Sequence, residues 1–174
     1  TRGLARSLAA LPCPPRTLVC ASAIGFYGDR GDDLVDEDSP PGTGFFPDLV
    51  RAWEAAAEPA REAGIRVVHL RFGVALAPAG GALDRLVPIF RACLGGRTGS
   101  GRQWMSWVAI DDVVGAALRA LSDASLAGAV NVVAPEPATN RDFAQTLAHV
   151  LGRPAFLPLP AFAVRLALGE LGEN

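Results

Sequence analysis

Hydrophobic and polar positions follow two spacings along the chain, one typical of buried strands and the other of amphipathic helices. Short apolar runs rich in β-branched residues predict strands at 17–22, 65–76 and 128–134. Apolar residues at helical spacing predict helices at 2–11, 48–63, 83–90, 111–121 and 141–151, and the apolar stretch after residue 154 predicts the start of one more. Strands that alternate with helices in this way predict an α/β fold with a parallel sheet.

Two segments between these elements have the composition of long loops. Residues 23–46 are rich in Gly, Asp and Pro, and a loop of this length is typical of a functional segment. Residues 94–107 are Gly-rich and then aromatic, which predicts a loop that leads into an extended piece. No Gly-x-Gly-x-x-Gly sequence follows a strand, so the sequence predicts no phosphate-binding turn of the dinucleotide type.

The composition excludes several chemistries. All 16 basic residues are Arg, the chain has no Lys, and Tyr27 is its only Tyr. A Schiff base on a Lys of this chain, a Walker-A loop and a Tyr–Lys proton-transfer pair are therefore impossible within it. The net charge of −2 gives no sign of a nucleic-acid partner, and no apolar run is long enough to predict a membrane span.

Cysteine, histidine and serine patterns exclude further classes of site. The three Cys residues are odd in number and scattered, which favours a reducing cytoplasm and argues against a disulfide framework or a zinc site. We expect no metal, because two distant His residues make a poor ligand set. Ser22 lies in Ala-Ser-Ala-Ile-Gly and not in the Gly-x-Ser-x-Gly turn of hydrolases.

Several segments, taken in order, resemble one enzyme superfamily. They are SAIGFYG at 22–28, Trp-Glu at 53–54, LRFGVALAPAGGAL at 70–83, GSGRQWMSWVAIDDVVGAAL at 99–118 and GAVNVVAPEPATNRDFAQTLAHVLGRP at 128–154. Together they resemble the extended short-chain dehydrogenase/reductases of the NAD-dependent epimerase/dehydratase superfamily, and within it the group called epimerase family proteins, which is nucleoside-diphosphate-sugar epimerase-like. The resemblance covers nearly the whole chain.

The resemblance implies a fold and a division into domains. Residues 1–93 would be the C-terminal part of a Rossmann-like, doubly wound parallel sheet, and residues 94–174 mainly a small α/β substrate-binding region. The helix Asp111–Leu121 and the strand 128–134 are expected to return to the core sheet. The N-terminal dinucleotide-binding half and the end of the substrate region would be missing from the chain.

The resemblance also implies an activity. The intact protein would be a cytoplasmic oxidoreductase or isomerase that binds NADP or NAD and acts on a small carbonyl or sugar-like substrate; a homodimer is compatible with it. The superfamily's usual acid is the Tyr of Tyr-x-x-x-Lys, with a Glu four positions after the Lys. If Glu54 is that Glu, Val50 occupies the Lys position and Phe46 the Tyr position. Val50 cannot hydrogen-bond a ribose, and Phe46 cannot donate or accept a proton. The alternative is therefore a non-catalytic cofactor-binding or regulatory protein on the same fold.

The candidate site residues follow from the same correspondence. Ser22 and Tyr27 are the catalytic candidates; a strand-end cap and a structural turn are their alternatives. The expected cofactor contacts are Ala21, Ser22, Arg71, Phe72, Gly73 and Val74, and the expected substrate contacts are Ala23, Arg102, Trp104 and Trp107. The two Trp residues suit core packing equally well. Arg71 ends a buried strand and needs either an acidic partner or a ligand.

Overall fold

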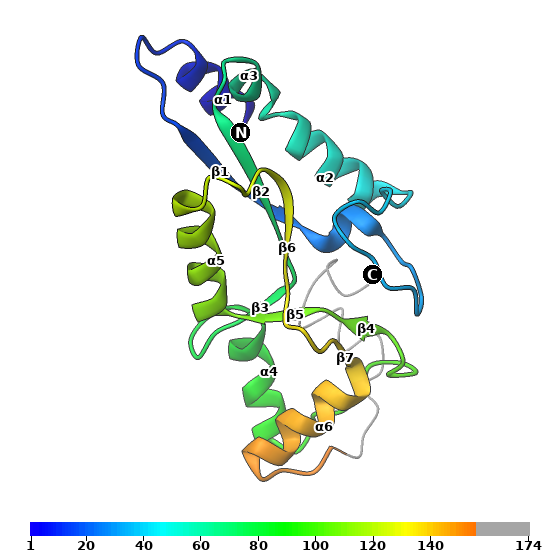
Figure 1. Cartoon of the computed structure of the whole chain (residues 1–174). Coiled ribbons are helices and arrows are strands. Elements are labelled where there is room, and N and C mark those ends of the chain that lie inside the picture. Colours follow the sequence, from blue (N-terminus) through cyan, green and yellow to red (C-terminus); the bar gives the residue numbers. More distant parts are fainter. Residues whose placement is uncertain (156–174) are drawn as a thin grey trace. The chain divides into compact units, whose positions relative to one another are not determined.

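The computed structural model describes residues 1–155, which fold into two compact units (Figure 1). The first unit consists of Thr1–Gly73 and Ile110–Val133, and the second contains Val74–Ala109 and the chain from Ala134 on. The polypeptide therefore leaves the first unit after Gly73, returns to it at Ile110 and leaves it again after Val133.

The first unit is built on a three-stranded parallel sheet in the order β1-β2-β6. Its elements are α1 (Arg2–Ala9), β1 (Thr17–Ala23), the 3₁₀ helix η1 (Ile24–Tyr27), α2 (Phe45–Ala55), α3 (Glu58–Glu62), β2 (Arg66–Phe72), α5 (Ile110–Ser122) and β6 (Gly128–Val132). The central strand β2 is buried on both faces, as expected for a parallel strand that is covered by helices. The chain from β1 through α2 and α3 to β2 forms the predicted strand–helix–strand unit.

Helices cover both faces of this sheet. Val67 of β2 and Leu18 and Cys20 of β1 pack in one cluster with Ala5 of α1 and Ala60 of α3. The opposite face carries Arg66, because side chains alternate along a strand. Its guanidinium donates to the carbonyl oxygens of Ala120 and Leu121 at the end of α5, at 2.9 and 3.3 Å, so α5 covers that second face (Figure 1). These bonds satisfy carbonyl groups that the last turn of a helix leaves without partners.

The helix predicted at 48–63 is divided into two. It begins earlier, at Phe45, so that Pro47 falls in the first turn, where a missing N–H group costs nothing. It stops at Ala55, and α3 starts at Glu58 with Pro59 in its first turn. Pro59 cannot donate the hydrogen bond that a continuous helix would need at this point. Proline chemistry therefore explains both differences.

The strand predicted at 65–76 is also divided, at Gly73. β2 ends at Phe72, whereas β3 (Val74–Leu76) pairs in parallel with β5 (Trp107–Ala109) of the second unit. The chain thus leaves the first unit after Gly73, whereas the resemblance implies that the Rossmann-like part continues to residue 93. The helix α4 (Gly81–Arg91) belongs to the second unit because its Phe90 is buried against Ala144 and Ala148.

The second unit also contains an antiparallel pair of short strands and one further helix. β4 (Trp104–Met105) pairs with β7 (Ala138–Thr139), and α6 (Asn140–Leu151) follows. Thr139 caps α6, because its side chain accepts a hydrogen bond from the backbone N–H of Asp142. Gly152 ends α6 in the left-handed conformation that favours glycine. The helix expected after residue 154 lies outside the described residues.

Candidate active site

Three polar side chains form one row across the sheet of the first unit. Ser22 of β1 is paired in register with Arg71 of β2, and Arg71 with Asn131 of β6. Neighbouring residues in a sheet point to the same face, so the three side chains share one face close to the carboxyl ends of the strands. Ligands of open α/β sheets bind at this end. Ser22 and Arg71 are each only 4% exposed.

Glu54 of α2 joins the first two members of this row. Its Oε1 atom accepts a hydrogen bond from Ser22 Oγ at 2.6 Å and another from Arg71 Nε at 2.9 Å. Its Oε2 atom accepts from Arg71 Nη2 at 2.9 Å. The Arg71–Glu54 pair is thus bidentate, the strongest arrangement for these two groups. Glu54 is therefore the acidic partner that a buried Arg71 requires.

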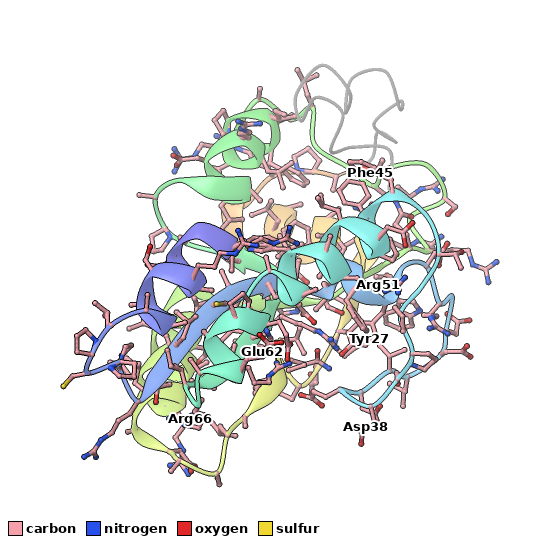
Figure 2. All side chains as sticks on the ribbon, turned by 90° about the horizontal axis from the view of Figure 1, so that it is seen from above. Tyr27, Asp38, Phe45, Arg51, Glu62 and Arg66 are labelled. Atoms are coloured by element: carbon pink, nitrogen blue, oxygen red, sulfur yellow. The ribbon has the colours of Figure 1, made fainter. Side chains whose placement is uncertain are left out.

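Tyr27 of η1 contacts the last two members of the row, Arg71 and Asn131. Figure 2 labels Tyr27 beside α2. Arg71 Nη1 donates to the Tyr27 hydroxyl at 2.9 Å, and that hydroxyl donates to Asn131 Oδ1 at 2.7 Å. The ring of Phe26 lies against the guanidinium, 3.5 Å from Arg71 Cζ to the ring centre. A cation is stabilised at the face of an aromatic ring. Arg71 is therefore held by an acid, a hydroxyl and a ring at once.

Electrostatics in this network favour the charged pair. Burial by itself raises the pKa of Glu54, but the hydrogen bonds from Arg71 and Ser22 and the charge of Arg71 outweigh it, so the pKa lies below its ordinary value. Burial lowers the pKa of Arg71, and its bonds to Glu54 and Tyr27 more than offset this, so the pKa is raised. Both groups are ionised at neutral pH.

The loop between η1 and α2 closes on this network. The backbone N–H of Asn131, on the edge strand β6, donates to Glu37 Oε1 at 2.7 Å. At the base of the loop the N–H of Gly42 donates to the carbonyl of Phe26 at 2.9 Å. A Cβ atom on residue 42 would lie 2.3 Å from the carbonyl oxygen of Tyr27, so only glycine fits there. The loop is thus fixed to the residues that carry the network.

His69 and Cys20 are register partners on the same sheet face as this row, one step nearer the amino ends of the strands. Burial lowers the pKa of His69 and raises the pKa of Cys20, which favours the neutral form of each. The Nε2 atom of His69 is buried without a hydrogen-bond partner. Neither residue has the charge state of a nucleophile or a general acid.

The residues predicted to contact the cofactor occupy different places in the first unit. Ala23 and Phe72, the last residues of β1 and β2, are register partners, and both are partly exposed. Gly73 follows, and its N–H donates to the carbonyl of Val132 at 3.2 Å. Ala21 is exposed on β1. Residues 21, 23 and 73 carry at most a methyl group as side chain.

The remaining candidates lie in the second unit. Val74 is exposed and is the register partner of Trp107, whose indole N–H donates to the carbonyl of Glu136 at 3.2 Å. Trp104 pairs in register with Thr139 and is half exposed. Arg102 is exposed. The structure therefore joins Ser22, Tyr27 and Arg71 in one network but not these four residues.

Two members of the network were not predicted as site residues. Glu54 had been considered only as a marker for the Tyr and Lys positions, although a buried Arg71 required such an acid. Asn131 had a weaker signal, as the polar residue of an otherwise apolar strand, GAVNVVA. Val50 and Phe46 lie one and two turns before Glu54 in α2, and both face Gly25 of η1. They supply apolar packing against η1.

Other types of site are not visible in residues 1–155. No cluster of three or more His, Cys, Asp or Glu side chains within this range is arranged to hold a metal ion. Nor does any helix of the described part have the length and apolar character needed to cross a membrane. The polar row of the first unit is thus the arrangement on which a functional assignment can be built.

Comparisons with known proteins agree on one family, although no protein family profile matches the chain. Epimerase family protein Mb2239 of Mycobacterium bovis is 46% identical over 158 residues, which cover 91% of this chain and 52% of the relative. The crystal structure of human epimerase family protein SDR39U1 with NADPH is 39% identical with a TM-score of 0.89, covering 97% of this chain and 57% of that one. A nucleoside-diphosphate sugar epimerase from Corynebacterium glutamicum is 37% identical with a TM-score of 0.76, covering 98% and 39%.

The match in sequence and the match in fold both run along almost the entire chain, and the chain spans about half the length of the curated relatives it matches. The chain belongs to the epimerase family proteins of the extended short-chain dehydrogenase/reductase superfamily.

Proposed function

We propose that the whole protein is an NADP(H)-dependent oxidoreductase or epimerase in which this chain forms the wall beside the nicotinamide. The row Ser22–Arg71–Asn131 at the carboxyl ends of the strands carries the proposal, because it fixes the strand ends where ligands of this fold bind. The structure of SDR39U1 with NADPH, at 39% identity, supports the choice of cofactor. When bound, the cofactor supplies the hydride.

In this proposal Ala23, Phe72 and Gly73 contact the nicotinamide, and the small size of Ala23 and Gly73 lets the ring approach the backbone. Val74 follows at the start of β3. The phosphate end of the dinucleotide would be held by residues outside this chain, because no glycine-rich turn follows a strand and opens a helix here. Arg71 acts behind this surface as a positioning residue, since Glu54 and Tyr27 already hold its guanidinium.

Ser22 and Tyr27 have different prospects as proton donors. Each hydroxyl hydrogen is already donated, from Ser22 to Glu54 and from Tyr27 to Asn131. The resemblance places Ser22 at the catalytic serine position of the superfamily, so we assign it the hydrogen bond to the substrate oxygen when it turns away from Glu54. The Tyr27 hydroxyl bridges Arg71 and Asn131, so a positioning role suits Tyr27 better. The substrate class is a small carbonyl or sugar-like compound.

A second function is favoured by the same hydrogen bonds. The hydroxyl hydrogens of Ser22 and Tyr27 are both engaged, and the chain has no Lys. The resemblance places Phe46 and Val50 at the positions of the usual acid and amine. These features suit a protein that binds the cofactor without turnover. Such a protein would be a cofactor-binding or regulatory module. The three free Cys residues favour a reducing compartment such as the cytoplasm for either function.

Cofactor absorbance separates the two functions. The protein expressed from its complete gene is first titrated with NADPH and NADH by calorimetry and is then incubated with NADPH and a library of small aldehydes, ketones and keto-sugars. Loss of the nicotinamide absorbance supports an oxidoreductase, and inversion of a sugar carbon detected by NMR without net loss of that absorbance supports an epimerase. Saturable binding with neither change across the library supports the second function. Loss of turnover in Ser22→Ala, with turnover retained in Ser125→Ala as the matched control, would assign the substrate contact to Ser22.

A further inference from the structure

The second unit contains a small cavity that the polar row of the first unit does not involve. Its lining residues are Arg97, Arg141, Ala144, Gln145 and Ala155, and its volume is about 180 Å³. Pockets that hold a whole small-molecule ligand usually measure roughly 300–1,000 Å³. The cavity therefore has room for one functional group of a ligand and not for a complete nucleotide sugar.

Two guanidinium groups converge in this cavity. Arg97 Nη1 donates to the carbonyl oxygens of Gly99 and Ser100, both at 2.8 Å. Arg141 Nη2 reaches the same Ser100 oxygen at 3.4 Å. The two positive charges thus share one uncharged acceptor. Each Arg carries five N–H donors, so most N–H groups of the pair remain for other acceptors.

No carboxylate among residues 1–155 neutralises these two charges, since neither Arg is in an ion pair there. Asp142 is adjacent in sequence, but its carboxylate accepts the hydroxyl hydrogen of Thr139 at 2.6 Å and does not line the cavity. The uncompensated repulsion between Arg97 and Arg141 would be relieved by an anion between them.

The loop that carries Arg97 is fixed to the start of α6, which carries Arg141. The N–H of Thr98 donates to Asn140 Oδ1 at 2.7 Å, and the N–H of Arg141 donates to the carbonyl of Gly101 at 2.9 Å. Gly101 has a positive φ of 70°, and a Cβ atom there would lie 3.1 Å from the stem of Arg97 and 3.2 Å from that of Arg141. Glycine therefore lets the two stems pack on one turn, and the pair is held in place before any ligand binds.

We propose that Arg97 and Arg141 bind the phosphoryl group of a phosphate ester. The planar guanidinium fork can donate to two oxygens of a phosphate at once, and Gln145 adds an amide donor to the same cavity. The neighbouring Arg102, which the sequence analysis singled out, is exposed and does not line the cavity. This inference rests on the second unit alone and does not depend on the proposed function.

An NMR titration of the 174-residue chain tests the site. The probes are inorganic phosphate, glucose 1-phosphate and acetate, each at constant ionic strength. We expect both phosphates to shift the backbone amides of residues 97–101 and 141–145 saturably, with dissociation constants of about 1 mM, and acetate to bind at least about tenfold more weakly. Arg141→Gln should weaken phosphate binding about tenfold, since a charge-assisted bond is lost.

Controls distinguish the site from general attraction between charges. Arg91→Gln and Arg153→Gln remove exposed charges of the second unit that do not line the cavity and should leave the affinity unchanged. Arg97→Gln, checked for folding by circular dichroism, should behave like Arg141→Gln, whose exposed position on α6 keeps the fold intact. The proposal is overturned if no amide shift saturates, if Arg141→Gln binds like the unaltered chain, if acetate binds as tightly as phosphate, or if glucose 1-phosphate does not bind.

Discussion

Glu54 is the residue whose removal tests the buried network most severely. Glu54→Ala deletes the carboxylate that accepts one hydrogen bond from Ser22 and two from Arg71. The guanidinium of Arg71 would remain 4% exposed, with the Tyr27 hydroxyl and the Phe26 ring beside it but no anion. A charge left in this state is far more costly than a charge that returns to water.

The size of the effect follows from this geometry. Removing one partner of a buried ion pair costs about 3–5 kcal/mol. The Glu54 side chain is 14% exposed, so water can reach the vacated space, and we expect the lower end, about 3 kcal/mol. Glu58→Ala is the matched control, because its pair with Arg61 on the same stretch of chain is 46–48% exposed. Exposed pairs of this kind contribute about 0–1 kcal/mol.

Urea denaturation followed by far-ultraviolet circular dichroism measures both variants. The double variant Glu54→Leu/Arg71→Met should recover most of the loss, because it leaves no buried charge unpaired. The pKa of Glu54 is lowered in the folded chain, so the difference between Glu54→Ala and the unaltered chain should be complete above the ordinary pKa of 4.5 and vanish as the pH falls through the folded value. A cost equal to that of Glu58→Ala would refute the reasoning.

Three further changes test other parts of the first unit. Burial lowers the pKa of His69, so the unfolded chain binds a proton at this residue first, and the free energy of unfolding should fall as the pH drops below the ordinary pKa of 6.5. Chemical denaturation at several pH values should show a smaller fall in His69→Leu. An equal fall in the variant would contradict this role of His69. Gly42→Ala places a Cβ atom 2.3 Å from the Tyr27 carbonyl oxygen and should lower the stability measured by thermal unfolding by about 1–3 kcal/mol. Gly115→Ala, which has open space in α5, should raise the stability by about 0.5–1 kcal/mol. Equal effects of the two variants would be inconsistent with the loop geometry. Tyr27→Phe leaves Arg71 Nη1 and Asn131 Oδ1 without their shared partner and should cost about 1–3 kcal/mol, measured by urea denaturation, while a neutral result would mean that water replaces the hydroxyl.

Much of the fold could be predicted from hydrophobic spacing, because that spacing records which faces are buried. The strands β1 and β2 and the helices α5 and α6 follow from it directly. The break at Gly73 could not be predicted from this spacing, because residues 65–76 are apolar on both sides of Gly73. Only the pairing of β3 with β5 shows that β2 and β3 are separate strands. The two-residue strands β4 and β7 exist only through their pairing with each other, so no local pattern marks them.

The candidate site was predictable in part for a similar reason. A buried Arg71 requires an acidic partner, and that requirement can be read in a single strand. The row of Ser22, Arg71 and Asn131 cannot be predicted from a single strand, because it depends on the register of three strands. The bond from Tyr27 to Asn131 joins residues 104 positions apart, and local sequence carries no information on such a contact. The absence of Lys from the chain, by contrast, is certain from the sequence.

The proposed nicotinamide wall is tested most directly by cofactor binding to the protein expressed from its complete gene. Calorimetry with NADPH compares the unaltered protein with Gly73→Val, which adds bulk where β2 ends, and with Gly115→Ala, which lies in open space on α5. We predict saturable binding to the unaltered protein and to Gly115→Ala, and an affinity at least about tenfold lower for Gly73→Val. Absence of NADPH binding to the unaltered protein, or equal affinity in Gly73→Val, would contradict the assignment.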